Sequence, residues 1–165
     1  MGRMAKEKLP TTPAVRVLKA EKVEFTSHTY TYEEHGGTEV SARELGVDEH
    51  AVVKTIVMED DSRKPLIVLM HGDLQVSGKQ LARIIGAKNI LSCSPEAAQK
   101  HTGYLVGGTS PFGTRTNMPV YMEETIMDLP HIYINGGKRG YLVGIDPKDA
   151  VRVLKPVMVK AGIEK

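Results

Sequence analysis

Ala51-Val52-Val53-Lys54-Thr55-Ile56-Val57-Met58 and Leu66-Ile67-Val68-Leu69-Met70 are two apolar runs, separated by the polar segment 59–64. Their length and their content of β-branched residues are typical of buried strands. The short polar segment leaves room for a turn between them, so we expect the two runs to pair as an antiparallel hairpin. The other predicted elements precede or follow this hairpin in the chain.

Lys54 is the exception within the first of these runs. On a strand it shares one face with Val52 and Ile56, while Val53 and Val57 occupy the other, so both faces are otherwise apolar. The lysine could block pairing at a sheet edge or reach water through its long stem. Alternatively, it lies in a pocket, where desolvation lowers its pKa below about 10.4. The pattern alone leaves both interpretations open.

Short helices and strands flank the hairpin. Capping residues predict helix starts at Thr12-Pro13, at Ser77 and at Ser94-Pro95, and Gly46 ends a helix over residues 39–45. A last helix is expected from Pro147 through Met158. Further strands are expected at residues 25–32, 104–106, 119–122, 132–135 and 141–145. Because no βαβ rhythm is present, we expect an α+β fold: a mixed, curled, barrel-like β-sheet surrounded by short helices.

Length and composition describe one ordinary globular unit. The 165 residues are enough for one domain, so we expect a flexible N-terminal tail at residues 1–10 and a single domain at residues 11–165. Aromatic residues make up only 5% of the chain, which predicts an aliphatic core and weighs against a stacking platform for single strands. A net charge of +2 permits a polyanionic partner without indicating one.

The sequence also bears on location. Cys93 is the only cysteine, which rules out a disulfide within the chain. The start is polar and lacks the apolar region of a signal peptide, and no segment is long and apolar enough to cross a bilayer. We therefore expect a cytoplasmic protein with no membrane partner.

Paired glycines mark the run from Gly103 to Gly113. Gly107 and Gly108 follow an apolar segment, where they allow the backbone to approach a ligand and direct N–H groups at it. The run is not a Walker loop, since no Gly-Lys-Ser/Thr follows. It is not a nucleophile elbow either, because the final glycine is missing and Pro111 has no N–H for an oxyanion. A tight structural turn is the alternative interpretation.

The loop from Asn135 to Gly140 and Cys93 can each be interpreted in two ways, and the histidines argue against a metal site. The loop from Asn135 to Gly140 combines glycines with two cations and could bind phosphate, or be a basic hairpin tip in solvent. Cys93 precedes a helix start, which could lower its pKa, or it could be a small packing residue. The six histidines show no metal-ligand spacing. We expect neither a metal nor a cofactor.

In this order, the segments resemble the YbaK family of Cys-tRNA(Pro) deacylases, relatives of the editing domain inserted in bacterial prolyl-tRNA synthetases. The resemblance extends from about Thr12 to the C-terminus and implies the barrel-like fold expected above. It is carried by these segments: Thr12-Pro13-Ala14-Val15, His28-Thr29-Tyr30, Val53-Lys54-Thr55, residues 102–113 and Gly136-Gly137-Lys138-Arg139-Gly140.

The resemblance also implies roles for individual residues. Lys54 matches a lysine expected to be essential, and Gly107 lies in the loop expected to hold the aminoacyl ester; both are predicted as catalytic. Two positions depart from the common pattern: Asn135 stands where a serine is frequent, and Leu142 where some members have an aspartate. The predicted substrate-binding residues are Tyr30 (at the pocket mouth), Thr55, Gly108, Ser110, Pro111 and Asn135.

The activity implied is that of a trans-acting hydrolase that cleaves the ester between an amino acid and the 3′-terminal ribose of mischarged tRNA. Cys-tRNA(Pro) is the expected substrate and prolyl-tRNA synthetase the expected partner. The chain offers no convincing nucleophile, so the attacking group is water or the substrate's own thiol. The alternatives are an editor of another mischarged tRNA, such as Ala-tRNA(Pro), and a non-catalytic module that binds tRNA or a synthetase.

Overall fold

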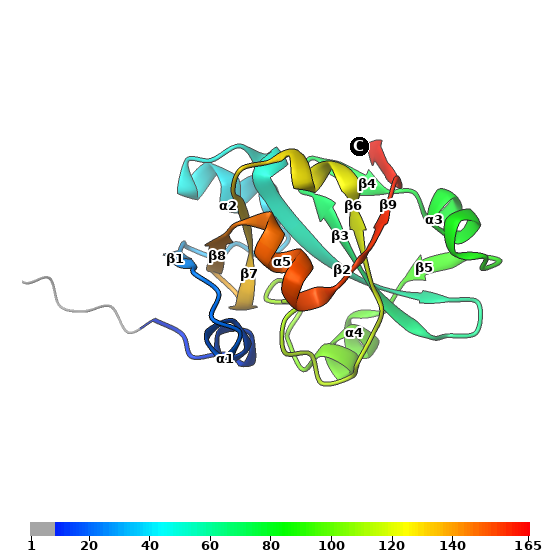
Figure 1. The fold of residues 1–165 in the computed structure, drawn as a ribbon, viewed down its shortest axis with the longest axis horizontal. Helices are drawn as coiled ribbons and strands as arrows, with labels where there is room; N and C mark the ends of the chain where they lie inside the picture. The colour runs from blue at the N-terminus through cyan, green and yellow to red at the C-terminus, as the bar shows by residue number, and fades with distance from the viewer. Residues whose placement is uncertain (1–8) are drawn as a thin grey trace, which may run out of the picture.

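A computed structural model of the protein describes residues 9–165 (Figure 1). The expected flexible tail lies largely outside the described residues, and residues 9–12 form no helix or strand. The helices are α1 (Pro13–Ala20), α2 (Gly37–Leu45), α3 (Gly78–Ile85), α4 (Pro95–Thr102) and α5 (Pro147–Leu154), with 3₁₀ helices η1 (Glu49–Ala51) and η2 (Glu124–Asp128). The strands are β1 (Thr26–Thr29), β2 (Val52–Asp60), β3 (Pro65–His71), β4 (Leu74–Val76), β5 (Ile90–Ser92), β6 (Val120–Glu123), β7 (Ile132–Lys138), β8 (Tyr141–Ile145), β9 (Val157–Val159) and β10 (Gly162–Glu164).

Side-chain caps begin the helices at the predicted positions. The Thr12 hydroxyl accepts a hydrogen bond from the N–H of Val15 at 3.1 Å, and Ser77 and Ser94 cap α3 and α4 in the same way. Gly46 ends α2 in the left-handed conformation, with φ of 67°. These local signals lie within the capping residues themselves, which is why the sequence predicts them well.

The predicted hairpin is confirmed and lies at the centre of a mixed sheet. Strand β2 pairs antiparallel with β3, and the sheet order is β1-β8-β7-β2-β3-β6-β9, with β5 added to β2. The sheet contains both antiparallel and parallel pairs; the parallel ones are β2 with β7, β3 with β6 and β6 with β9. The α+β class and the mixed, curled sheet are therefore confirmed; β1 and β9 are the two ends of an open path of strands.

Strand β2 has a gap along the edge that faces away from β3. On that edge β7 pairs only with Val52 and Val53, and β5 pairs only from Met58 onward. No strand within residues 9–165 pairs with residues 54–57 there. Because β7 and β5 approach from opposite ends, the middle of a central strand is left with an open edge.

The main-chain groups of Thr55 face this gap. The carbonyl of Val52 accepts from Gly72 N–H on the β3 side, whereas the carbonyl of Val57 accepts from Cys93 N–H on the other side. Since successive residues of a strand direct their N–H and C=O groups to alternate edges, Thr55 shares the edge of Val57. Within the described residues, no group pairs with the N–H or C=O of Thr55 at that edge.

Both faces of β2 are covered. Val53 and Val57 join the largest core cluster, which includes Leu18 of α1 and Ala150 of α5. On the opposite face, Met58 packs with Leu81 and Ala82 of α3, and Val52 packs with Ala42 of α2. Lys54 lies on this second face, between the two smaller clusters. The sequence pattern of a strand without a solvated face is thus confirmed.

Two predicted elements are wrong. Residues 104–106 form a turn rather than a strand, because Tyr104 is anchored by its hydroxyl to the Phe112 carbonyl and Gly108 N–H bonds back to Leu105. The last helix ends at Leu154, since Lys155 adopts the left-handed conformation and a proline follows. Val157 and Met158 therefore belong to strand β9.

Strand lengths also differ from the prediction. Strand β1 is shorter than the predicted segment 25–32. The strands β4, β5 and β10 have three residues each, too few for an alternating pattern to show in the sequence.

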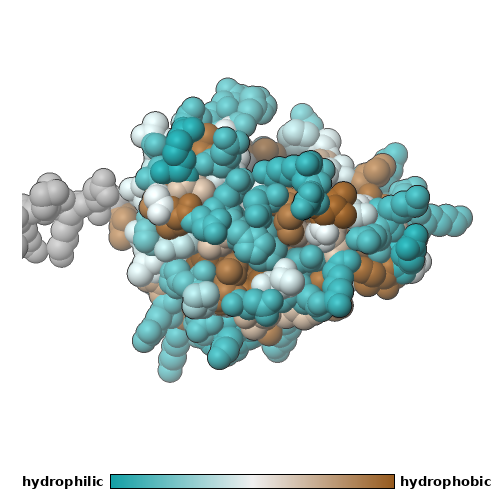
Figure 2. All heavy atoms as spheres, turned by 90° about the horizontal axis from the view of Figure 1, so that it is seen from above, coloured by the Kyte–Doolittle hydropathy of each residue, from teal (hydrophilic) through white to brown (hydrophobic). Residues whose placement is uncertain are grey.

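Hydrophilic residues cover most of the face shown in Figure 2, with hydrophobic residues in small separate groups. Within residues 9–165, no helix combines the length and the hydrophobicity that crossing a membrane requires.

The core assignment predicts unequal effects of two leucine truncations. Leu69 is fully buried, whereas Leu91 is 64% exposed. We expect Leu69→Ala to lower the free energy of unfolding by about 2–5 kcal/mol through lost burial and a residual cavity. The matched control Leu91→Ala should cost about 0.5 kcal/mol or less. Urea denaturation measures both, and equal losses would contradict the placement of β3 in the core.

Candidate active site

A cavity of about 550 Å³ lies along the open edge of β2. Residues 52–57 form its floor, and α2 and the segment before it form one wall. The opposite side comes from the start of α4, the glycine loop and the β7–β8 connection. The cavity thus coincides with the gap between β7 and β5.

Lys54 lines this cavity and is half-buried there. Its Nζ donates a long hydrogen bond of 3.4 Å to the Gly72 carbonyl. Burial lowers the pKa of the Lys54 ammonium and Lys165 lowers it further, while Glu49 and Asp73 act in the opposite direction. Of the two sequence interpretations, the structure supports a partly desolvated cation in a pocket.

Thr55 brings unpaired polar groups to the same place. Among residues 9–165, the Thr55 hydroxyl oxygen is the only buried polar side-chain atom without a hydrogen-bond partner. Its main-chain N–H and C=O face the open edge, as described above. A buried polar group without a partner costs about 1–3 kcal/mol.

The glycine loop closes the cavity opposite Lys54. Gly107 lines the cavity with φ of +91°, and a Cβ there would lie 2.5 Å from the Tyr32 hydroxyl. The N–H of Gly108 donates to the Leu105 carbonyl at 2.8 Å and closes a turn. The N–H of Gly107 has no acceptor within the described residues. Gly107 therefore lines the cavity with a main-chain N–H that is not engaged within the described residues.

The β7–β8 connection holds this loop in place. Asn135 Nδ2 donates to the Gly107 carbonyl at 3.1 Å, and Asn135 Oδ1 accepts from the N–H of Gly137. Arg139 Nε donates to the Val106 carbonyl at 2.9 Å, and its guanidinium lies 5.1 Å from the centre of the Tyr32 ring. This basic loop is the tip of the β7–β8 hairpin, with Lys138 and Arg139 exposed, and it also packs against the glycine loop.

The structure brings five of the eight predicted site residues to the cavity: Tyr30, Lys54, Thr55, Gly107 and Asn135. The other three do not line it. Gly108 packs so closely against the β7–β8 connection that a Cβ would lie 2.7 Å from the main-chain nitrogen of Arg139. Ser110 is fully buried and accepts from the N–H of Phe112, and Pro111 borders a separate cavity.

Residues that the sequence reasoning did not select also line the cavity, among them Tyr32, Thr38 and Arg139. Tyr32 lies two residues after Tyr30, and Arg139 belongs to the basic loop that was singled out, so both had a local signal. Thr38 had none, because it lies at the start of a helix whose position relative to β2 is set by tertiary packing.

Cys93 lines the cavity but is not an activated nucleophile. Burial, followed by the neighbouring Glu59, raises the pKa of its thiol to about 11. The hypothesis that the helix start lowers this pKa is wrong, because Ser94 caps α4 and the N–H of Cys93 is spent on Val57. The thiol is thus protonated at neutral pH.

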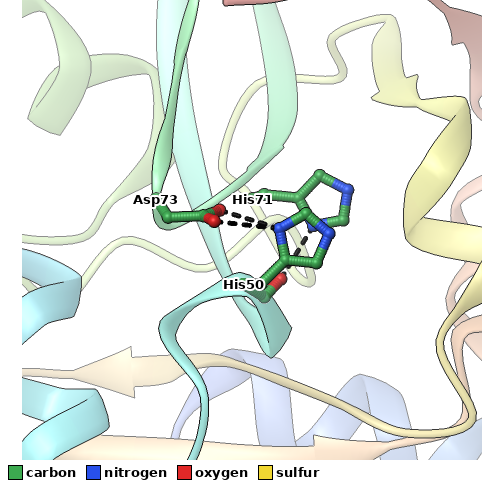
Figure 3. Close-up of side chains that lie close together, drawn as sticks. All are labelled: His50, His71 and Asp73. Carbon is green, nitrogen blue, oxygen red and sulfur yellow. Dashed lines mark hydrogen bonds and ion pairs between the residues drawn. The ribbon is translucent and has the colours of Figure 1, made fainter. Parts of the chain in front are cut away.

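His50, His71 and Asp73 form a polar cluster next to the cavity, with ligand-type atoms within 4.8 Å of one another (Figure 3). His50 Nδ1 lies 2.9 Å from Asp73, and the two imidazole rings stack 3.7 Å apart at an angle of 6°. His71 Nδ1 donates to the His50 carbonyl and its Nε2 accepts from the Thr125 hydroxyl, each at 2.7 Å. His71 must carry its ring proton on Nδ1, because the His50 carbonyl can only accept a hydrogen bond.

This arrangement does not fit a metal ion. The lone pair of an imidazole nitrogen lies in the plane of its ring. Because the two planes are parallel and 3.7 Å apart, the lone pairs of His50 and His71 cannot point at one ion. Both nitrogens of His71 are also engaged in hydrogen bonds. The cluster is a structural support beside Lys54.

Comparison with known proteins gives the family. The model of the aminoacyl-tRNA editing domain matches residues 33–153, which include the cavity floor, the glycine loop and the β7–β8 connection. The chain belongs to the aminoacyl-tRNA editing domain family. Membership makes it an editing protein of the hydrolase class that acts on aminoacyl-tRNA, and the resemblance seen in the sequence is confirmed.

Two relatives and one solved structure illustrate the match. A candidate Cys-tRNA(Pro)/Cys-tRNA(Cys) deacylase, EbsC of Enterococcus faecalis, is 29% identical over 88% of this chain and 90% of its own length. The proline–tRNA ligase of Thermodesulfovibrio yellowstonii is 32% identical over 87% of this chain, which spans only 23% of that ligase. The crystal structure of a candidate trans-editing enzyme for prolyl-tRNA synthetase shares the fold, with a TM-score of 0.79, 19% identity and coverage of 93% and 99% of the two chains.

The buried His71 predicts a dependence of stability on pH. Burial, and then the neighbouring His50, lower the pKa of His71 below its ordinary value of 6.5, although its hydrogen bond to the His50 backbone acts in the opposite direction. Below pH 6.5 the unfolded chain therefore binds a proton that the folded chain does not. The free energy of unfolding should fall as the pH decreases from 6.5, by up to about 1.4 kcal/mol per pH unit for this group.

Thermal unfolding between pH 5 and 7 checks this expectation. His71→Asn, which keeps an N–H donor for the His50 carbonyl, should flatten the dependence. His35→Asn is the matched control, since the His35 side chain is 92% exposed. An unchanged slope in His71→Asn would show that His71 is not the group responsible.

Proposed function

We propose that the protein is a trans-acting editing hydrolase that removes cysteine from Cys-tRNA(Pro) by cleaving the ester to the 3′-terminal ribose. One observation carries the proposal: Lys54, Thr55 and Gly107, whose main-chain N–H has no acceptor within the described residues, all line one cavity. The candidate deacylase and the ligases among the relatives support the choice of substrate.

In this proposal, Lys54 and Gly107 act on the ester from opposite sides. The Lys54 ammonium stabilises negative charge that develops on the ester oxygen or binds the terminal phosphate. The N–H of Gly107 polarises the carbonyl, as an oxyanion-hole donor does. Tyr30, Thr55 and Asn135 complete the binding of the aminoacyl end, whereas Gly108, Ser110 and Pro111 keep the loop in its conformation.

The attacking group comes from outside the protein. Ser110 is buried away from the cavity and the Cys93 thiol is protonated, so neither is a suitable nucleophile. Water or the thiol of the substrate cysteine can attack the carbonyl once the ester is oriented. Catalysis then rests on positioning and electrostatics, and no covalent intermediate with the enzyme forms.

The partner and the location follow from the substrate. The proposed partner is prolyl-tRNA synthetase, which would select tRNA(Pro) while this domain acts on the aminoacyl end; a proline–tRNA ligase contains a segment similar to this domain. We place the activity in the cytoplasm, where tRNA is charged, and assign it to residues 11–165 as one editing unit.

Replacing Lys54 tests the catalytic assignment. Lys54→Ala removes the cation at the cavity floor, and we expect the deacylation rate of Cys-tRNA(Pro) to fall about 100-fold or more, as for other transition-state donors. Lys79→Ala, which removes an exposed lysine of α3, is the matched control and should keep the parent rate. Single-turnover release of labelled cysteine measures both. A Lys54→Ala protein that retains the parent rate refutes the role of Lys54.

A panel of mischarged tRNAs tests the substrate. Incubation of the protein with Cys-tRNA(Pro), Ala-tRNA(Pro) and Cys-tRNA(Cys), with and without prolyl-tRNA synthetase, should show fastest loss of the amino acid from Cys-tRNA(Pro) when the synthetase is present. Faster loss from Ala-tRNA(Pro) would reassign the substrate. Protection of the ester against spontaneous hydrolysis would identify a binding module and overturn the proposal.

A further inference from the structure

The turn between β3 and β4 meets η1 directly beside Lys54. This turn consists of Gly72 and Asp73, and η1 carries Glu49. We propose that Glu49 and Asp73 are positioning residues that hold the Lys54 ammonium at the Gly72 carbonyl, on the cavity side of β2. The proposal rests on the proposed function, since it concerns the residue assigned there as catalytic.

Gly72 is the point where the contacts meet. Its N–H donates to the Val52 carbonyl at 2.7 Å, and its own carbonyl is within reach of Lys54 Nζ at 3.4 Å and of the Thr38 hydroxyl at 3.1 Å. A Cβ at this position would lie 2.7 Å from Thr38 Oγ1 and 2.8 Å from the Glu49 carbonyl. The turn therefore approaches α2 and η1 so closely that only glycine fits.

Glu49 is tied to this point through Thr38. The Thr38 hydroxyl oxygen lies 2.7 Å from Glu49 Oε2 and 3.1 Å from the Gly72 carbonyl, so the carboxylate and this carbonyl are neighbours across one hydroxyl group, whose single proton can be donated to either of them. Lys165 Nζ lies 3.2 Å from the same oxygen. The Glu49 side chain is only 24% exposed. Its charge is thus held beside Lys54 instead of moving freely in solvent.

Asp73 is held from the other side by the histidine pair in Figure 3. Both carboxylate oxygens lie within 3.1 Å of His50 Nδ1, which donates to them. The His50 ring stacks on His71, and His71 is fixed at both nitrogens by the His50 carbonyl and by Thr125. His71, which is buried and bonded at both nitrogens, thus supports the His50 ring, and His50 in turn orients the Asp73 carboxylate.

The charges around Lys54 give the two carboxylates a function. Burial and Lys165 lower the pKa of Lys54, and Glu49 and Asp73 raise it, so these carboxylates favour the charged form that the proposed chemistry requires. The other charged or titratable groups that line the cavity or border the supporting turn are Tyr30, Tyr32, Glu33, Glu34, His35, Cys93, Arg139, His50 and His71. None of these is tied to the Gly72 carbonyl as Glu49 is through Thr38.

Titration of Lys54 in the free protein tests the proposal without relying on activity. NMR of protein labelled with [¹³C]lysine reports the titration of each lysine, and loss of one signal in Lys54→Arg assigns Lys54. In Glu49→Gln and in Asp73→Asn the Lys54 midpoint should move to lower pH, and in Lys165→Gln it should move to higher pH. Glu44→Gln, an exposed position on α2, is the control and should leave the midpoint unchanged.

A second measurement separates this proposal from the proposed function. In a deacylation assay, Glu49→Gln and Asp73→Asn should lose rate at alkaline pH earlier than the parent, and Glu49→Asp, which keeps the charge, should restore the parent profile. Unchanged Lys54 midpoints in Glu49→Gln and Asp73→Asn overturn the proposal. If the parent deacylates no tRNA, the proposed function fails, and the titration still decides the role of the carboxylates. Should one variant fail to fold, Lys165→Gln at the surface and the other carboxylate variant remain decisive.

Discussion

The gap along one edge of β2 is the constraint on which the site depends. A central strand normally pairs on both edges, but β7 and β5 approach β2 from opposite ends and leave residues 54–57 open. The open edge exposes polar main-chain groups that a sheet would otherwise satisfy. It also provides room for a cavity whose floor is a strand in the interior of the sheet. A ligand that fills the gap is therefore held by a strand and not by a flexible loop.

Lys54 is tolerated in this place because the protein supplies partial compensation for its charge. Burying an ammonium among apolar clusters is unfavourable without partners. Here the ammonium lies near acceptors, namely the Gly72 carbonyl and the carboxylates of Glu49 and Asp73, and the open cavity gives it access to water. The cation remains available to a substrate while its position is restricted. On the opposite wall, Asn135 and Arg139 restrict the glycine loop in the same way.

The cavity combines a cation with a free main-chain donor and contains no activated nucleophile among its described residues. This combination suits an ester that is already reactive, because aminoacyl esters require orientation and charge stabilisation more than covalent catalysis. Family membership, the free N–H of Gly107 and the protonated Cys93 all agree with such a mechanism. In the proposed mechanism, the protein acts mainly by holding two reacting groups in the right relative position.

The sequence predicted the parts of the fold that are encoded locally. The hairpin of β2 and β3, the caps at Thr12, Ser77 and Ser94, and the unusual environment of Lys54 each have a signal within a few residues. The three-residue strands and the position of β9 lack such a signal, because they are formed by pairing with distant segments.

The same distinction applies to the site. Lys54 and Gly107 were selected from local patterns and from the family resemblance, and the structure brings them to one cavity. Thr38, Glu49 and Asp73 could not be selected, because their meeting at Gly72 is a product of tertiary packing. Ser110 and Pro111 lie within the most recognisable motif but away from the cavity, since a motif also contains residues that shape its backbone.

Binding of a substrate analogue tests the account most directly. Cysteinyl-adenosine with an amide in place of the 3′ ester cannot be hydrolysed, and its titration into ¹⁵N-labelled protein can be followed by NMR. The account predicts that the amide signals of Lys54, Thr55 and Gly107 shift together as the analogue fills the gap beside β2. Shifts confined to another surface, such as the separate cavity beside Pro111, with none at these three residues, would contradict it.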